Sequence, residues 1–180
     1  MAGSLGVEWA DWDAWMPGDS AEEYTPKFPF RVYLDGLRSP FNVGSVMRTA
    51  VAFGAERLWV SPECASPLHP RCRRSAMGAD GRLSWQTASL DDLTGKETGT
   101  LFALELGGTS LSDFHFPSSG TVILGSEELG VRPELMRRAE SDAGVVSIAL
   151  PGPKASLNVG VAFGILMQRW CEYVQTAGDS

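Results

Sequence analysis

From residue 31 onward, apolar and polar positions follow two periodicities, one typical of strands and one typical of helices. Short runs rich in β-branched and aromatic residues, bounded by glycine, proline or charged residues, predict strands. Six such runs are RVYLDGL (31–37), ERLWVSP (56–62), LSWQT (83–87), TLFALEL (100–106), TVILGSEELGV (121–131) and VVSIALPG (145–152). The polar, basic segment between the second and third runs predicts no regular element.

Two longer stretches have helical periodicity, NVGSVMRTAVAFGA (42–55) and ASLNVGVAFGILMQRWCEYVQ (155–175). Ser39 or Asn42 suits the N-cap of the first helix, and Ser89 suits the cap of one helical turn in SLDDLTG. Because strands alternate with helices, we expect an α/β domain with a mainly parallel sheet flanked by helices. Ligand sites in such folds lie outside the carboxyl ends of the strands.

The chain divides into an acidic arm (1–30), one domain (31–176) and a polar tail (177–180). Trp9, Trp12 and Trp15 recur every three residues in the arm, which suits a short amphipathic helix. Two interpretations of these rings stay open, packing against the domain or a partner subunit and stacking on a ligand or base. No linker or low-complexity tract interrupts residues 31–176, so we expect a single domain there.

Composition narrows the class of protein further. No stretch approaches the roughly 18 consecutive apolar residues of a membrane span, and the first thirty residues lack the pattern of a secretory signal. Three scattered cysteines favour a reducing cytoplasm, and no Cys or His cluster has the spacing of a metal site. We therefore expect a cytoplasmic protein that needs no membrane and no metal.

The net charge of −7 argues against a broad positive surface for nucleic acid. A local basic patch remains, with Arg71, Arg73 and Arg74 in one segment and Lys154 in a separate loop. These four side chains are our candidates for contacts with nucleic-acid phosphates. A solvated face of the protein is the alternative.

Three segments place polar side chains next to the expected strand ends. Asn42 and Arg48 are six residues apart, close to two helical turns, so both can face one side of the first helix. Gly125 permits close backbone approach after a strand, and Glu127 adds a carboxylate beside it. Each segment alone is also consistent with an ordinary helix cap or turn.

The third segment, SIALPGPKASLNVGVAFG, runs from a strand through a proline-rich loop to Ser156 and Asn158 at a helix start. Backbone groups buried in such a loop need partners, and the edge of an adenine ring is one source of them. Neither the dinucleotide-binding GxGxxG nor the Walker A motif is present. A nucleoside cofactor would therefore be held by an unusual loop.

The ordered trio NVGSVMR, ILGSEELGV and IALPGPKASLNVGVA resembles the three signature motifs of the SpoU/TrmH family of RNA ribose 2′-O-methyltransferases, in the SPOUT superfamily. The stretch RSAMGA (74–79) is similar to one that the family carries between its first two motifs. The resemblance covers residues 31–176. It implies a parallel sheet whose C-terminal segment forms a trefoil knot, and a homodimer with the site at the subunit interface.

The resemblance also implies S-adenosylmethionine as cofactor and a ribose 2′-hydroxyl of tRNA or rRNA as methyl acceptor. Four residues match family positions that enclose the adenosine: Leu104, Gly125, Leu150 and Leu157. Arg48 would orient the substrate phosphate and stabilise the developing alkoxide, because an arginine is a poor base at its normal pKa. The supporting roles fall to Asn42, which would hold Arg48 or the ribose, Glu127, which would fix Arg48, and Ser156 and Asn158, which would order the knot loop. The alternative is a catalytically idle protein of this fold that binds cofactor or RNA as a structural or regulatory module.

Overall fold

The computed structural model describes residues 24–89, 92, 97–153 and 156–178. Three predictions therefore lie wholly or largely outside the described residues: the arrangement of the tryptophans at 9, 12 and 15, the helical turn after Ser89, and the position of Lys154. The passage of the C-terminal segment through a knot stays a prediction.

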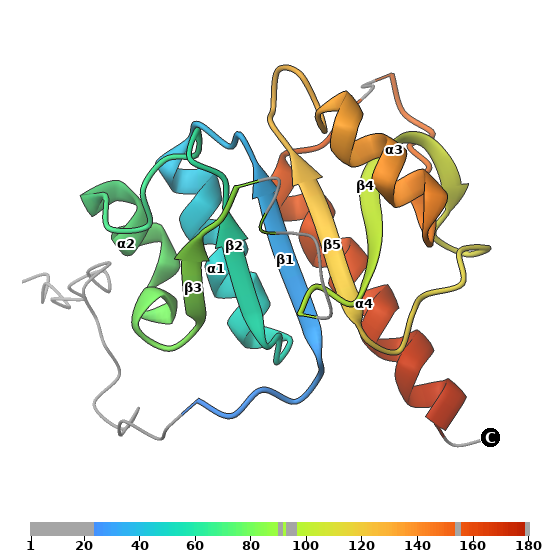
Figure 1. Ribbon diagram of the computed structural model, residues 1–180, viewed down its shortest axis with the longest axis horizontal. Helices are drawn as coiled ribbons and strands as arrows, with labels where there is room; N and C mark the ends of the chain where they lie inside the picture. The colour runs from blue at the N-terminus through green and yellow to red at the C-terminus, as the bar shows by residue number, and fades with distance from the viewer. Residues whose placement is uncertain (1–23, 90–91, 93–96, 154–155, 179–180) are drawn as a thin grey trace, which may run out of the picture.

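A six-stranded sheet forms the centre of the domain, and every strand pairs in parallel with its neighbour (Figure 1). The strand order is β3-β2-β1-β5-β4-β6. The predicted mainly parallel α/β sheet is thus confirmed. The strands are β1 (Phe30–Asp35), β2 (Arg57–Val60), β3 (Ser84–Thr87), β4 (Thr100–Ser110), β5 (Gly120–Gly125) and β6 (Gly144–Ser147).

Helices cover both faces of the sheet. The first face carries α1 (Pro40–Ala52), α2 (Pro70–Ala76) and α4 (Val159–Gly178), and the short 3-10 helix η1 (Ala79–Gly81) follows α2. The second face carries α3 (Pro133–Ser141) over β4 and β6. Alternate residues of β1 serve the two layers, since Val32 packs toward α1 and α4 whereas Tyr33 packs in the layer of α3.

The long helix α4 is fixed to the sheet by Trp170, which is fully buried. Its ring stacks on Phe30 of β1 with 3.8 Å between the centroids, and its Nε1 donates to the Pro117 carbonyl at 2.7 Å. Burial of an aromatic ring that also satisfies its N–H is among the larger single contributions to a core. The start of α4 is thereby held beside the carboxyl ends of the strands.

The sequence Asn-Val-Gly occurs at the start of α1 and again at the start of α4, and each glycine makes a close helix contact. A Cβ at Gly44 would fall under 3.0 Å from Ser75 and from the backbone of Cys72 in α2. A Cβ at Gly160 would fall at 2.6 Å from Ser45 Oγ in α1. The two glycines therefore let α1 pack closely against α2 on one side and α4 on the other.

Two helices and part of a strand were not expected from the sequence. Helices α2 and α3 occupy segments without a predicted helix, and β4 continues to Ser110 instead of ending near residue 106. The extra part of β4 depends on Gly107, with φ +79°, and on Gly108, whose missing side chain leaves room for the Val145 backbone of β6. Among the described residues, no helix is long and apolar enough to cross a membrane.

Candidate functional site

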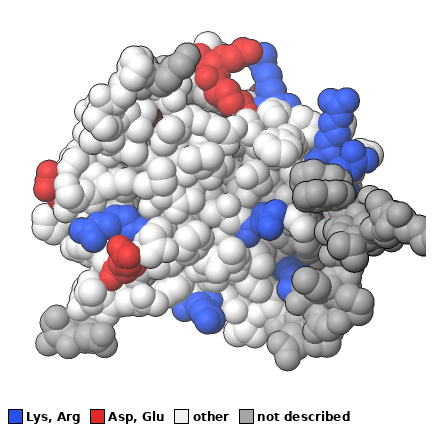
Figure 2. Space-filling model, turned by 180° about the vertical axis from the view of Figure 1, so that it is seen from behind, with Lys and Arg blue, Asp and Glu red and all other residues white. Residues whose placement is uncertain are grey.

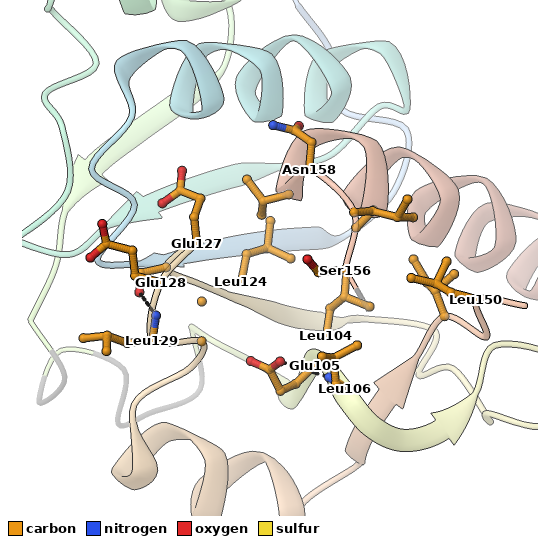
Figure 3. Close-up of a pocket in the computed structure, with 17 residues that line it drawn as sticks. Leu104, Glu105, Leu106, Leu124, Glu127, Glu128, Leu129, Leu150, Ser156 and Asn158 are labelled. Carbon is orange, nitrogen blue, oxygen red and sulfur yellow. Dashed lines mark hydrogen bonds between the residues drawn. The ribbon is translucent and has the colours of Figure 1, made fainter. Parts of the chain in front are cut away.

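A cavity of about 730 Å³ opens at the carboxyl ends of β4 and β5 (Figure 3). This is the edge at which ligands bind in parallel α/β sheets. Its walls come from the middle of β4, the turn after β5, the segment after β6 and the first turn of α4 with the residues before it. The lining residues are 104–106, 124–130, Ile148, Leu150, 156–159 and Ala162.

One side of the cavity is apolar and contains the four residues that the family resemblance assigns to the cofactor. Leu104 and Leu150 come from the segments around β4 and β6, Gly125 ends β5, and Leu157 precedes α4. Figure 3 shows the Leu104, Leu124 and Leu150 side chains among those that line the cavity. The fold thus brings all four positions to one cavity, although their role toward a cofactor stays a prediction.

The turn after β5 is closed on itself and gives the cavity a rigid wall. Ser126 N–H donates to the Gly130 carbonyl at 3.1 Å, and Gly130 N–H donates to the Ser126 carbonyl at 3.0 Å. Glu105 Oε2 accepts from Val131 N–H at 3.1 Å and so ties the turn to β4. A Cβ at Gly125 would collide with the backbone of Gly130 and Val131, so this geometry requires glycine.

A chain of three polar side chains joins α4, α1 and the turn after β5. Asn158 Oδ1 accepts from Gly160 N–H at 2.9 Å, while its Nδ2 donates to Asn42 Oδ1, also at 2.9 Å. Asn42 Nδ2 in turn donates to Glu127 Oε1. The Gly160 N–H fixes which way the Asn158 amide faces. The Asn42 amide then has one orientation in which its hydrogen bonds to both Asn158 and Glu127 are satisfied. Asn42 itself is 6% exposed.

Of the predicted catalytic residues, Glu127, Ser156 and Asn158 line the cavity and Asn42 bonds to two of them. We expected Glu127 to fix Arg48, and Asn42 to hold Arg48 or the ribose. Within the chain Asn42 and Glu127 bond to each other, and Arg48 Nη1 donates to Met77 Sδ at 2.8 Å. The roles of these residues toward a substrate stay predictions. Arg48 is exposed on α1 and is not part of the cavity wall.

The predicted basic patch contains two kinds of arginine. Arg71 and Arg74 are exposed on α2, whereas Arg73 Nε contacts Asp80 Oδ2 at 3.0 Å. Figure 2 shows Lys and Arg side chains near the edge where α2 lies, while much of the face over α1 and α4 carries no charge. Arg71 and Arg74 are therefore better placed than Arg73 to meet a phosphate.

One pair of charged residues beside the site was not predicted. The Asp35 carboxylate, 1% exposed at the end of β1, accepts from Arg132 N–H at 2.7 Å and pairs with Arg132 Nε. Partial burial tends to lower the pKa of Arg132, but the neighbouring Asp35 charge outweighs it and the pKa is raised. The pair ties the residues before α3 to β1. The sequence feature that could have indicated this pair is an aspartate, Asp35, at the end of an apolar strand.

Replacing Asn42 with alanine should lower the free energy of unfolding by about 0.5–1.5 kcal/mol, because the hydrogen bonds of its buried amide to Asn158 and Glu127 are lost while those two exposed side chains can bond to water. Urea denaturation monitored by circular dichroism measures the change. Gln168→Ala is the matched control, since Gln168 Nε2 donates to Glu172 Oε1 at 2.8 Å on the exposed face of α4. The control should change stability by less than about 0.5 kcal/mol. Equal effects at the two positions would contradict a structural role for the polar chain Asn158–Asn42–Glu127.

Comparison with known proteins supports the resemblance seen in the motifs. The profile of the SpoU rRNA Methylase family matches residues 29–168. An uncharacterized tRNA/rRNA methyltransferase of Synechocystis sp. is 31% identical over 147 residues, covering 76% of this chain and 53% of that protein. The 23S rRNA (guanosine-2′-O-)-methyltransferase RlmB of Acinetobacter baylyi is 26% identical over 145 residues, covering 77% of this chain and 57% of that protein.

Among solved structures, the AdoMet-bound rRNA methyltransferase from Sinorhizobium meliloti superimposes with a TM-score of 0.74 at 26% identity. The match covers 84% of this chain and 61% of that one. The chain spans a little over half the length of the curated relatives cited above. The profile match extends over most of the sequence, and the matched residues contain all three motifs together with the cavity and the polar chain. The chain therefore belongs to the SpoU rRNA Methylase family.

Proposed function

We propose that the protein transfers a methyl group from S-adenosylmethionine to a ribose 2′-hydroxyl of tRNA or rRNA. The observation that carries this proposal is the chain Asn158–Asn42–Glu127, which joins the three motif segments at the mouth of one cavity. Each of these side chains has an ordinary structural use alone, but their convergence on a ligand-sized cavity favours a site. The named activity of the relative from Acinetobacter baylyi supports the same reaction.

The residues of the cavity fit S-adenosylmethionine. Leucine side chains provide an apolar slot suited to an adenine ring, and Gly125 lets the turn after β5 fold back on itself beside the cavity. Carboxylates of Glu105, Glu127 and Glu128 line the same cavity and favour a cationic ligand over a neutral one. When bound, the cofactor supplies a methyl group made electrophilic by its sulfonium.

The protein's own residues must place the ribose and stabilise charge on its oxygen. Arg48 binds the adjacent phosphate and, as a permanent cation, stabilises the 2′-oxygen as its proton leaves. Asn42, Glu127 and Asn158 hold one another in a fixed arrangement, so the ribose meets groups that are already oriented. Ser156 borders the cavity from the loop before α4 and completes this polar side.

We also propose that the active form is a homodimer in which Arg48 of one subunit completes the cavity of the other. Arg48 does not line the cavity of its own chain. The face over α1 and α4 is largely uncharged in Figure 2 and exposes apolar side chains. These are Phe41, Leu157, Val161 and Ile165. An exposed apolar surface rimmed by polar residues is typical of an interface.

The decisive experiment maps ribose methylation in total RNA from cells with and without the gene. We expect one or a few 2′-O-methylated nucleotides to disappear in the deletion and to return with the wild-type gene. Restoration must fail with a variant that lacks Arg48. A methylation pattern that is identical with and without the gene, in cells shown to express the protein, would favour the idle binding module instead.

Reversing the charge of Arg71 and Arg74 together, each to glutamate, should weaken RNA binding at least about tenfold at low salt. The slope of the logarithm of the binding constant against the logarithm of the salt concentration should also fall in magnitude by roughly one to two. Fluorescence anisotropy with labelled tRNA or rRNA fragments measures both quantities.

Arg137→Glu is the matched control, because Arg137 is exposed on α3, on the other face of the sheet. It changes the net charge in the same direction without touching α2. If it weakens binding as much per charge as the α2 variant, the effect is one of overall charge and the patch is a solvated face. Arg73→Glu should instead lower stability, since it places a carboxylate against Asp80.

A further inference from the structure

Met77 has an unusual backbone conformation for its residue type. It ends α2 with φ 49° and ψ 48°, the left-handed region that residues with a Cβ adopt reluctantly. Among the described residues it is the only non-glycine with positive φ. Helices commonly end in this conformation, but usually with glycine. A strained backbone retained at one exposed position points to a use for the side chain.

The side chain of Met77 reaches the residue that the proposed reaction needs most. Met77 Sδ accepts from Arg48 Nη1 at 2.8 Å, although Met77 is 47% exposed and Arg48 is also exposed. Met77 therefore lies at the surface, where it contacts Arg48 and is not buried in the core. The left-handed turn at the end of α2 directs it toward Arg48 on α1.

The kind of partner also matters. In the same region, Arg73 is held by the carboxylate of Asp80, which compensates its charge. Arg48 has a neutral thioether as partner, and no described carboxylate lies within 4.0 Å of its guanidinium. A sulfur acceptor restrains the long side chain and leaves its positive charge available to a phosphate.

We propose that Met77 is a positioning residue for Arg48, holding the guanidinium in a defined place without neutralising it. This inference rests on the proposed function, because it assigns Arg48 to the reaction. Arginine has several rotatable bonds, and a free guanidinium would have to lose this freedom during the reaction. Because the contact with Met77 already restricts the Arg48 side chain, less conformational entropy is lost when Arg48 engages the substrate.

Met77→Gly separates this role from a structural one. Glycine adopts positive φ without strain, so the variant should unfold at the same temperature as wild type or higher. Its kcat for methyl transfer should fall about tenfold, with the KM for S-adenosylmethionine unchanged. Met77→Gln, unbranched and carrying an acceptor oxygen, should recover most of the lost kcat. Leu68→Gly, which removes a 65% exposed apolar side chain near α2, should retain wild-type activity.

Three results would overturn the proposal. One is an unchanged kcat in Met77→Gly, another is a rise in the KM for RNA alone, and the third is a glutamine variant as defective as the glycine variant. The second would mean that Met77 contacts the substrate itself.

The contact can also be tested without activity. In protein labelled at the methionine methyl carbons, the Met77 signal is assigned by its absence in Met77→Leu. Arg48→Ala should move this signal and leave that of Met136, on α3, in place. An unmoved Met77 signal would refute the contact. If wild-type protein methylates no RNA, the proposed function fails, while the NMR result still decides whether Met77 holds Arg48.

Discussion

Arg48→Ala should reduce methyl transfer by about a thousandfold while leaving S-adenosylmethionine binding within about twofold of wild type. The side chain is exposed and lies outside the cavity wall, so its removal leaves the cofactor-binding surface intact. The loss arises because Arg48 is the cation that stabilises the 2′-oxygen in the proposed reaction. Transfer of a tritiated methyl group to RNA measures the rate, and isothermal titration calorimetry measures cofactor affinity.

Arg169→Ala is a suitable control for Arg48→Ala. Arg169 is on α4 and its guanidinium lies 3.9 Å from Glu172, away from the proposed reaction. The control should keep both activity and cofactor affinity. Full activity in Arg48→Ala would remove Arg48 from the mechanism, and equal loss in the two variants would indicate a general effect of surface charge.

Gly125→Ala should weaken S-adenosylmethionine binding by at least about a hundredfold and lower the free energy of unfolding by about 1–3 kcal/mol. The added Cβ would collide with the backbone atoms of Gly130 and Val131, which have no flexible end that can move aside. The turn after β5 must therefore open, and it provides a continuous part of the cavity wall. Calorimetry and urea denaturation measure the two effects.

Gly81→Ala makes the same chemical change where no atom lies within 4 Å of the added carbon. It should leave cofactor affinity unchanged. If Gly125→Ala binds S-adenosylmethionine like wild type, the cofactor does not use this turn and the assignment of the cavity is wrong.

The two variants together test the proposed sharing of the site between subunits. An Arg48→Ala chain keeps its cavity, and a Gly125→Ala chain keeps its Arg48. If Arg48 acts in the partner's cavity, a mixed dimer regains one working site, so random mixing should restore about a quarter of wild-type activity. If each chain uses its own Arg48, the mixture stays as inactive as its components.

The sequence was sufficient for the alternation of strands and helices but not for the shorter helices. Helix α2 is seven residues long and buries only Cys72 and Ala76, too few positions to define a helical period. Helix α3 likewise buries Leu135 and Ala139, one turn apart. Both helices are stabilised mainly by contacts with other elements of the fold. The local pattern of apolar residues gives no information about such contacts.

For the site, the motifs identified the residues but not all of their partners. The cavity contains the four leucine and glycine positions expected from the family, because these lie at strand ends and at the start of α4. The bonds of Asn42 join residues 85 and 116 positions apart and depend on how closely α4 packs against α1. The contact of Arg48 with Met77 depends on a left-handed turn that residue preferences argue against.

The bond between Asn158 and Asn42 also has a consequence for biosynthesis. A chain emerging from the ribosome at about 5–20 residues per second completes α1 well before α4 exists, by roughly 6–24 s. During this interval Val43, Val46 and Met47 lack the contacts of Trp170 and its neighbours on α4, which complete this layer of the core. The nascent protein thus exposes the apolar face of α1 to solvent during translation. Its cavity forms only after α4 has been synthesised.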